Sequence, residues 1–306
     1  MVVIILAPPP PDDEHAAHMH AHLLERGVDV EWIDSAEFPQ QLQATYVPTS
    51  NVVRFTTAAG RSIASDEIRS VYWRTYSGIE AQALPDPEQS FIAENDARSF
   101  FESVLMTMPV RWVNGWNAYR LHRTKPAALA MVSALELKQV EIPATTVTNT
   151  PLAVREFVSK HPDCIFKPVQ GGAHTRVVTE DHLTDEALGR LAVAPVTIQQ
   201  NISGFDIRVF VCGERVMACE IQTEKLDFRD DDDPTIVPVE LPEGVASDCL
   251  AIARKLELLW TGIDLRRTDD GQYFYFEANP SPMFMGFEER CGLPLTKALG
   301  DLLCVH

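Results

Sequence analysis

The sequence predicts two kinds of architecture in one chain: an N-terminal α/β domain with a parallel sheet, followed by a strand-rich α+β region. The first is indicated by a β-branched strand at Val2–Leu6, a helix at Glu14–Arg26 and a second strand at Val28–Ile33. The second is indicated by the last third of the chain, which is dominated by short apolar strands. A length of 306 residues suits two domains, or three small ones, at about 150 residues per domain.

The opening segment is expected to be a buried strand rather than a signal peptide. Val2–Leu6 has no basic flank and is cut short by a proline run. Gly27 ends the helix that follows. The other elements expected in this domain, which runs to about residue 118, are strands at Val52–Phe55 and Ile68–Arg74 and a long helix at Phe91–Met106. The domain lacks G-x-G-x-x-G, so it is not an evident dinucleotide binder.

The middle of the chain changes character and leads into the strand-rich region. It is expected to contain the helices Lys125–Leu137 and Pro151–Lys160, the extended link Glu141–Thr145, the strand Cys164–Pro168, the turn Gln170–Thr175 and a returning strand at Val177-Val178. The last third is expected to contain the strands Val196–Gln200, Ile207–Cys212, Arg215–Ile221 and Phe274–Ala278 and the helices Asp248–Glu257 and Leu295–Leu303.

Composition excludes several classes of partner. With a formal net charge of −18, the chain is a poor candidate for holding nucleic acid by bulk charge, although a local pocket for one nucleotide is not excluded. No apolar run approaches the roughly 18 residues of a membrane span. The six cysteines are scattered without a C-x-x-C pair, as reduced core thiols are. We therefore expect a cytoplasmic protein with neither nucleic acid nor membrane as partner.

The C-terminal segment carries the clearest functional pattern. Glu277 and Asn279 lie two residues apart in an expected strand, so they project from the same face, and Asp264 lies in a neighbouring strand. Oxygen ligands of this kind are what Mg²⁺ prefers, with phosphate oxygens and water completing its shell. The alternative is a half-exposed antiparallel hairpin with ordinary polar alternation.

Two further patterns concern anions. Lys167 stands at a strand end beside the Gly171-Gly172 turn, where backbone N–H groups and an ammonium group suit a phosphate; a plain glycine hairpin is the alternative. Asp206 and Arg208 share one face of an otherwise apolar strand. Either they pair with each other, or the arginine steadies a phosphoryl group.

The order of these features resembles the ATP-grasp superfamily, including its ribosomal-protein glutamate ligase (RimK-like) branch. The resemblance extends from Lys125 to the Asn279–Pro282 segment. The N-terminal third, with Val71–Arg74 and Trp112–Asn114, is similar to the pre-ATP-grasp region of microviridin-type peptide cyclases, the graspetide synthetases, and so is the segment Glu220–Arg229. The chain departs from these cyclases in having Trp73-Arg74-Thr75-Tyr76 for W-R-R-P and Ser281–Met285 for a G-Q-W type segment.

The resemblance implies a pre-ATP-grasp parallel-sheet domain at residues 1–118 and a two-lobe ATP-grasp fold, with a central lobe at 119–197 and a C-terminal lobe at 198–306. It implies an ATP-dependent carboxylate–amine or carboxylate–alcohol ligase that works through an acyl phosphate. The substrate would be a ribosomal precursor peptide, with leader and core, whose Asp or Glu side chains are joined to Ser, Thr or Lys side chains. The alternatives are a RimK-like enzyme that adds a free amino acid and a non-catalytic nucleotide- or peptide-binding protein. A homodimer is also expected.

The resemblance also implies roles for individual residues. Those expected at ATP are Lys125, Lys167, Gly171, Gly172, Gln199, Gln200, Asn201, Ile202 and Asp206. Those expected at Mg²⁺ are Asp264, Glu277 and Asn279. Arg208 and Lys167 are the expected catalytic groups, and the expected substrate contacts are Arg74, Arg208, Asp227 and Arg229.

Two features outside this set are open to other readings. His15, His18 and His22 fall on one helical stripe that zinc could use, but we expect exposed surface histidines. Trp73 lines a substrate channel or caps the core of the first domain.

Overall fold

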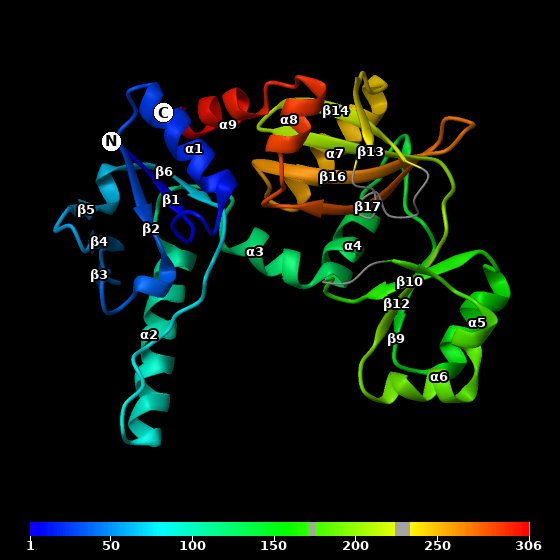
Figure 1. Cartoon of the computed structure of the whole chain (residues 1–306), viewed down its shortest axis with the longest axis horizontal. Coiled ribbons are helices and arrows are strands. Elements are labelled where there is room, and N and C mark those ends of the chain that lie inside the picture. Colours follow the sequence, from blue (N-terminus) through cyan, green and yellow to red (C-terminus); the bar gives the residue numbers. More distant parts are fainter. Residues whose placement is uncertain (172–174, 224–232, 306) are drawn as a thin grey trace.

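The protein, described here by a computed structural model covering residues 1–171, 175–223 and 233–305, has a parallel sheet at its N-terminus (Figure 1). Its strand order is β2 (Val30–Ile33), β1 (Val2–Leu6), β6 (Ile68–Trp73) and β7 (Arg111–Val113). Helices α1 (Glu14–Glu25) and α2 (Pro87–Thr107) complete the domain, together with a small antiparallel sheet of β3 (Gln43–Val47), β4 (Val52–Thr56) and β5 (Ser62–Ala64). The predicted parallel-sheet start is confirmed.

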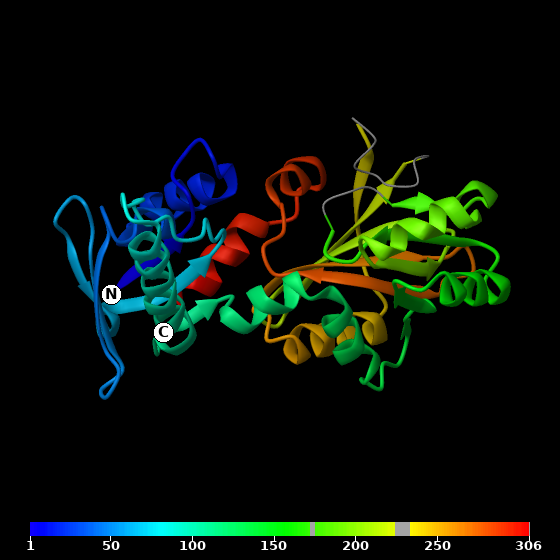
Figure 2. The same ribbon diagram turned by 90° about the horizontal axis from the view of Figure 1, so that it is seen from below.

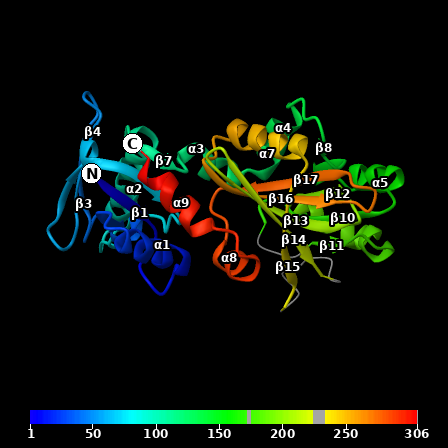
Figure 3. The ribbon, with the colours of Figure 1, turned by 90° about the horizontal axis from the view of Figure 1, so that it is seen from above.

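Both faces of this sheet are covered, which explains the uninterrupted apolar run of β1. Val2, Ile4 and Leu6 belong to the cluster that includes the buried face of α2. Val3 and Ile5 belong to a second cluster, shared with α1 and with the C-terminal helix α9 (Leu295–Cys304). Helices α1 and α9 lie side by side in Figures 1 and 3. The end of the chain thus returns to close the N-terminal domain.

A four-stranded antiparallel sheet forms the small lobe of the second part. Its order is β11 (Arg176–Val177), β10 (Cys164–Pro168), β12 (Val196–Gln200) and β9 (Thr145–Thr148). Cys164 and Ile198 turn toward helices α5 (Pro151–Lys160) and α6 (Asp185–Gly189). The period-2 alternation leaves Lys167 and Gln199 on the opposite face, where they line a cavity.

A six-stranded sheet forms the large lobe. Its order is β15 (Thr235–Val239), β14 (Arg215–Gln222), β13 (Phe205–Cys212), β16 (Trp260–Arg267), β17 (Tyr273–Asn279) and β8 (Val140–Glu141). Helices α7 (Glu243–Lys255) and α4 (Lys125–Ser133) lie together on one side of it (Figure 3). The core between them contains apolar side chains from β13 and β16 such as Val209 and Ile263. The other face of the sheet is free to carry polar groups.

Two helices join the parts (Figure 2): α3 (Trp116–Arg123) leads from β7 to α4, and α8 (Met285–Cys291) leads from β17 to α9. Short 3₁₀ turns occur at Ser35–Glu37, Ser65–Glu67, Glu180–Leu183 and Arg190–Ala192. Within the described ranges, no helix is long and apolar enough to cross a bilayer.

Most predicted elements are present, with shifted ends. Helix α2 begins at Pro87, before the predicted Phe91, because Asp86 caps it by accepting from the N–H groups of Glu88 and Gln89. Helix α7 likewise begins before Asp248, and α4 ends at Ser133 rather than Leu137. The pattern does not predict β3, β5, β15, α3, α6 or α8, which are short or weakly periodic.

Candidate active site

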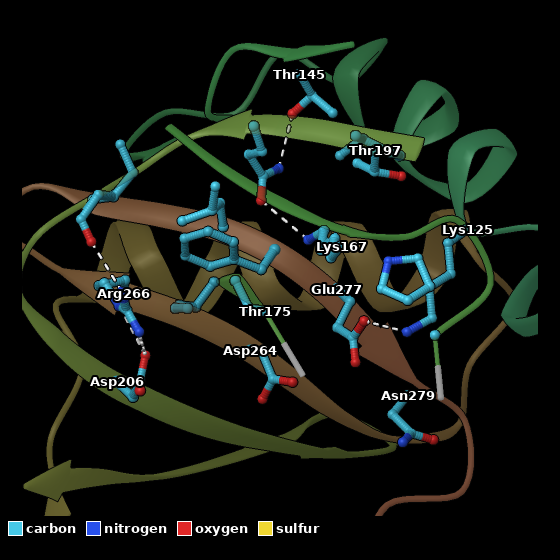
Figure 4. Close-up of a pocket in the computed structure, with 18 of the residues that line it drawn as sticks. Lys125, Thr145, Lys167, Thr175, Thr197, Asp206, Asp264, Arg266, Glu277 and Asn279 are labelled. Atoms are coloured by element: carbon cyan, nitrogen blue, oxygen red, sulfur yellow. Dashed lines mark hydrogen bonds and ion pairs between the residues drawn. The ribbon is translucent and has the colours of Figure 1, made fainter. Parts of the chain in front are cut away.

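A cavity of about 390 Å³ lies between the small and the large sheet. Its walls come from β10 and β12 on one side, from β13, β16 and β17 on the other, and from the start of α4 (Figure 4). The volume lies within the range typical of small-molecule sites, about 300 to 1,000 Å³. The side chains that face it are therefore the candidate functional groups.

A row of charges crosses three strands of the large sheet. Arg208 of β13 lies opposite Asp264 of β16, which in turn lies opposite Glu277 of β17. Arg208 Nε is 3.0 Å from an Asp264 carboxylate oxygen. Lys125, the first residue of α4, closes the row with its ammonium group 2.6 Å from Glu277 Oε2. Two carboxylates thus stand next to each other, with a cation at either end.

A β-bulge in β17 brings Glu277 into this row. Leu265 pairs with Tyr275, but the next pair is Asp264 with Glu277, so Phe276 is the extra residue. Tyr275 is buried in the core under the sheet, whereas Phe276 and Glu277 both line the cavity. Without the bulge, the period of two would place Glu277 on the core side with Tyr275.

Asn279 lies one pleat further along β17 and faces the same cavity (Figure 4). It pairs with Gly262, and its side-chain Oδ1 accepts a hydrogen bond of 2.9 Å from the backbone N–H of Ser281. A Cβ at Gly262 would lie only 2.9 Å from Arg208 Nη1, so glycine leaves room for the arginine. Asp264, Glu277 and Asn279 thus converge, as the sequence predicts, and present oxygens from two strands.

Gly171, the described glycine of the predicted turn, lies against Lys125. Gly171 has a φ of +108°, a conformation that favours glycine, and a Cβ there would be 3.3 Å from Lys125 Nζ. Gly172 lies outside the described residues.

Lys167 is held on the opposite wall by a chain of side chains. Its ammonium group donates to Gln199 Oε1 at 3.0 Å, and Gln199 Nε2 donates to Thr145 Oγ1 at 2.8 Å. Lys167 Nζ also lies 5.8 Å from the centre of the Phe276 ring. Burial lowers the pKa of Lys167, while Glu277 acts in the opposite direction. The sequence indicates Gln199 as a nucleotide contact but gives no reason to single out Thr145.

Burial affects the two carboxylates of the row in different ways. It raises the pKa of Asp264 to about 6, although the Arg208 guanidinium opposes this. Burial would also raise the pKa of Glu277, but Lys125 above all, then Lys167 and Arg208, hold the pKa below its ordinary value. Glu277 is therefore ionised at neutral pH before any ligand arrives.

One of the two alternatives for the D-x-R segment, a pair between Asp206 and Arg208, is replaced by pairs across strands. Asp206 binds Arg266 at 2.6 Å and Arg208 pairs with Asp264, so two D-x-R segments on antiparallel strands exchange partners. Arg266 also donates to the carbonyl of Ile202 at 3.0 Å. The register between β13 and β16, which pattern alone does not give, decides this arrangement.

The remaining predicted residues divide into three groups. Asn201, Ile202 and Asp206 line the cavity, whereas Gln200, described but half buried, is not among its lining residues. Arg74 lies in the N-terminal domain and binds Asp13 and Ser281. Asp227 and Arg229 fall outside the described residues.

The histidine stripe was expected to be exposed, which is wrong for His15. Its ring is 9% exposed and lies 4.9 Å from that of Phe284, because α1 packs against the C-terminal segment. His18 bonds Thr296 of α9 at 2.8 Å. Among the residues that the structure describes, no three His, Cys, Asp or Glu side chains are grouped to hold a metal, so a zinc site on this stripe has no support.

Trp73 belongs to the core of the N-terminal domain, where it contacts Trp112, Trp116 and Tyr119. It is buried, which supports the core reading of this residue over the channel reading.

The donors facing the cavity suit a magnesium–nucleotide complex. Two carboxylates and one amide oxygen are hard ligands that leave coordination positions for phosphate oxygens and water. Two ammonium groups, of Lys125 and Lys167, line the same cavity and suit phosphate charge.

Comparison with known proteins agrees with this geometry. A profile described as a RimK-like ATP-grasp domain matches residues 129–303, more than half of the chain. The chain belongs to the RimK-like ATP-grasp family. The predicted membership in the ATP-grasp ligases is thereby confirmed. A search of curated proteins found no match.

Solved ATP-grasp structures resemble the whole chain. The ATP-grasp ligase PsnB, complexed with a phosphomimetic variant of a minimal precursor, Mg and ADP, is 29% identical, with a TM-score of 0.83 over 99% of this chain and 97% of that one. The macrocyclase MdnC of Microcystis aeruginosa MRC, bound with the precursor peptide MdnA, is 20% identical, with a TM-score of 0.84 over 100% of both chains. A RiPP-associated ATP-grasp ligase of Chryseobacterium gregarium, in complex with ADP and a leader and core peptide, is 24% identical, with a TM-score of 0.84 over 99% of this chain and 96% of that one. The predicted fold is confirmed along its full length.

Proposed function

We propose that this protein is an ATP-dependent macrocyclase that joins Asp or Glu side chains of a ribosomal precursor peptide to its Ser, Thr or Lys side chains. The observation that carries the proposal is the row Arg208, Asp264, Glu277 and Lys125, with Asn279 beside it, inside a cavity between two lobes. The peptide substrate is favoured because a solved structure of PsnB, which is 29% identical to this chain, is of its complex with a minimal precursor.

The side chains present divide the binding of ATP and Mg²⁺ between them. Asp264, Glu277 and Asn279 would hold one or two Mg²⁺ ions, which supply charge neutralisation at the β- and γ-phosphates. Lys125 and Lys167 would contact phosphate oxygens, helped by the Gly171–Gly172 turn. Lys125, now paired with Glu277, would exchange that carboxylate for phosphate. Gln199 near the end of β12, Asn201 and Ile202 directly after it, and Asp206 in β13 line the cavity and would contact the nucleoside, whereas Gln200 does not line the cavity.

The proposed reaction has two steps. In the first, a carboxylate oxygen of the peptide attacks the γ-phosphorus of ATP, which breaks the bond to the β–γ bridging oxygen and releases ADP. In the second, a hydroxyl or amine of the same peptide attacks the carbonyl carbon of the acyl phosphate. The bond between that carbon and the phosphate oxygen breaks, phosphate leaves, and the nucleophile loses its proton.

Arg208 is the proposed catalytic group for the second step. Its side chain is 12% exposed, lines the cavity and is oriented by Asp264 at 3.0 Å and by the Phe287 ring, 5.4 Å from its guanidinium carbon. A fixed cation at this place would stabilise the negative charge of the tetrahedral intermediate. Lys167 would act on the transferred phosphoryl group. Covalent catalysis by the protein is not required, because positioning and charge neutralisation supply the acceleration.

Mass spectrometry tests the proposal. The full chain is incubated with ATP, Mg²⁺ and a precursor peptide rich in Thr, Ser, Asp and Glu, and we expect the peptide to lose the mass of one water for each bond formed. Fragmentation then locates the crosslinks. An increase in peptide mass when free amino acids are supplied would instead favour amino-acid ligation, the RimK-like alternative. Nucleotide binding without turnover of any peptide would contradict both enzymatic proposals.

A further inference from the structure

Arg74 crosses from the N-terminal domain to the segment that follows β17. Its Nη1 donates to the backbone carbonyl of Ser281 at 2.6 Å and to Ser281 Oγ at 2.7 Å. The Ser281 hydroxyl donates in turn to the carbonyl of Arg74 at 2.5 Å. The side chain of Arg74 is only 11% exposed. Three hydrogen bonds therefore fix Ser281 in position and orientation.

The other side of Arg74 is held by a buried carboxylate. Arg74 Nε donates to Asp13 Oδ1 at 3.1 Å, and Thr75 Oγ1 donates to Asp13 Oδ2 at 2.7 Å. Asp13 is also the N-cap of α1, since it accepts from the N–H of Ala16 at 3.0 Å. The guanidinium group is thus anchored to the first helix of the chain and cannot turn freely.

Ser281 in turn determines which way the Asn279 amide faces. Its backbone N–H donates to Asn279 Oδ1 at 2.9 Å, which distinguishes the oxygen from the nitrogen of that amide. A cation binds an amide through its oxygen, and a reversed amide would present N–H groups to it. An amide oxygen has two lone pairs, so one remains for a cation after this bond has formed.

We propose that Arg74 is a positioning residue for the metal site: Asp13, Arg74 and Ser281 form a relay that holds the Asn279 amide oxygen toward the bound cation. The proposal rests on the proposed function, because it takes Asn279 as a metal ligand. It gives the N-terminal domain a part in metal binding, and it assigns Arg74 to the metal site rather than to direct substrate contact.

A second contact between the N-terminal domain and the rest of the chain does not end at a proposed ligand. Ser70 of β6, for example, donates to the carbonyl of Leu303 at 2.8 Å and is fully buried. This bond joins β6, the strand directly before Arg74, to α9, and it does not lead to Asn279. Ser70 therefore provides a matched control for the loss of one buried bond between the two parts.

The test measures cation affinity directly. Mn²⁺ binding to the full chain in the presence of ADP is followed by electron paramagnetic resonance for Arg74→Lys, which keeps the charge beside Asp13, and for the milder Ser281→Ala. We expect each to weaken Mn²⁺ binding, Arg74→Lys by about tenfold, as loss of a group that orients a ligand does in other metal sites. Ser70→Ala should leave Mn²⁺ affinity unchanged even where it lowers thermal stability.

A double substitution separates the relay from a merely structural effect. If Arg74 acts through Asn279, Arg74→Lys should cause no further loss of Mn²⁺ affinity in an Asn279→Ala background. Additive losses, or an unchanged affinity in both relay variants, would overturn the relay. Glu277→Ala tests the metal site separately. Unchanged Mn²⁺ affinity in Glu277→Ala would contradict the metal assignment itself. Reduced affinity in Glu277→Ala together with unchanged affinity in Arg74→Lys would contradict the relay alone.

Discussion

The two walls of the cavity are built differently. One wall, Asp264, Glu277 and Asn279 on β16 and β17, is named the metal wall after its proposed ligand, and it belongs to a six-stranded sheet backed by two helices. The other, Lys167 and Gln199 on β10 and β12, is named the phosphate wall after its proposed ligand, and it belongs to a four-stranded sheet with a smaller helical cover. The difference suits the proposed ligands: Mg²⁺ demands near-ideal geometry from its oxygens, whereas a lysine ammonium is a compact charge on a long stem that adapts to phosphate.

The metal wall is also hydrogen-bonded to the N-terminal domain. The Asn114 side chain, which follows β7 and is 3% exposed, donates to the carbonyls of Trp260 and Pro280 at 2.7 Å each. Its Oδ1 accepts from the N–H of Leu259 at 2.7 Å. One amide therefore ties the start of β16 to the end of β17, the two strands that carry the proposed ligands.

The largest expected effect comes from the metal wall. Glu277→Ala removes a proposed ligand and should lower ATP turnover by about 10²- to 10³-fold, which corresponds to the several kcal/mol expected of a metal site. Steady-state ADP release with peptide and Mg²⁺ measures it. Glu141→Ala, which changes an exposed carboxylate on β8 of the same sheet, is the control and should retain activity. Normal turnover in folded Glu277→Ala would refute the metal assignment.

A smaller effect of a different kind is expected from the phosphate wall. Lys167→Met should raise KM for ATP by about 10- to 100-fold, because a charge-assisted hydrogen bond is worth roughly 1.5–3 kcal/mol. Initial rates at varied ATP measure it, with Lys160→Met at the exposed end of α5 as the control. An unchanged KM would show that Lys167 does not contact the nucleotide and would remove the contrast between the walls.

The last expected effect is on folding stability rather than on catalysis, and it concerns the contact of His15 in α1 with Phe284, which follows β17. Burial, assisted by Arg74 and His18 and opposed by Asp13, lowers the pKa of His15 to about 4. The unfolded chain, with a pKa of about 6.5, binds a proton that the folded chain does not, so stability is lost as pH falls from 6.5 toward 4. Between pH 7 and pH 5 this costs about 2 kcal/mol.

Denaturant unfolding at the two pH values checks this contribution. His15→Phe should reduce the loss of stability between pH 7 and pH 5, since a phenyl ring can pack on Phe284 without titrating. His20→Phe, on the same helix, leaves His15 in place and should retain the full loss. Equal losses in wild type and His15→Phe would mean that other groups account for the pH dependence.

The residues whose placement could be predicted from sequence are those that local periodicity brings together. The spacing of Glu277 and Asn279 gives a shared face, and Lys167 beside a glycine turn suggests an anion site. The alternation of Val2–Leu6 with the next helix and strand gives the parallel sheet. Each of these predictions uses residues of one element or of elements adjacent in the sequence, where the periodicity of apolar and polar residues is informative.

The groups that could not be predicted depend on register or on contacts between distant segments. The bulge at Phe276, which aims Glu277 into the cavity, appears only in the pairing of β16 with β17. The partner of Arg208 depends on the register of β13 against β16. Thr145 and Asn114 act through bonds to segments far away in the sequence. The domain boundaries, the homodimer and the cytoplasmic location stay predictions.

The return of α9 to the N-terminal sheet limits how this enzyme can be recombined with its relatives. Leu295, Leu299 and Leu303 share a core with Val3 and Met19, and that core also contains Trp260 of the catalytic sheet. A hybrid with a single crossover near residue 118 would combine the N-terminal sheet of one parent with α9 of the other. The side chains that pack between them would then come from different parents and would not be matched. An exchange that transfers Met285–Cys304 together with the N-terminal domain keeps these two parts of that core from one parent. Engineering of hybrid ATP-grasp ligases on this scaffold therefore requires two crossover points.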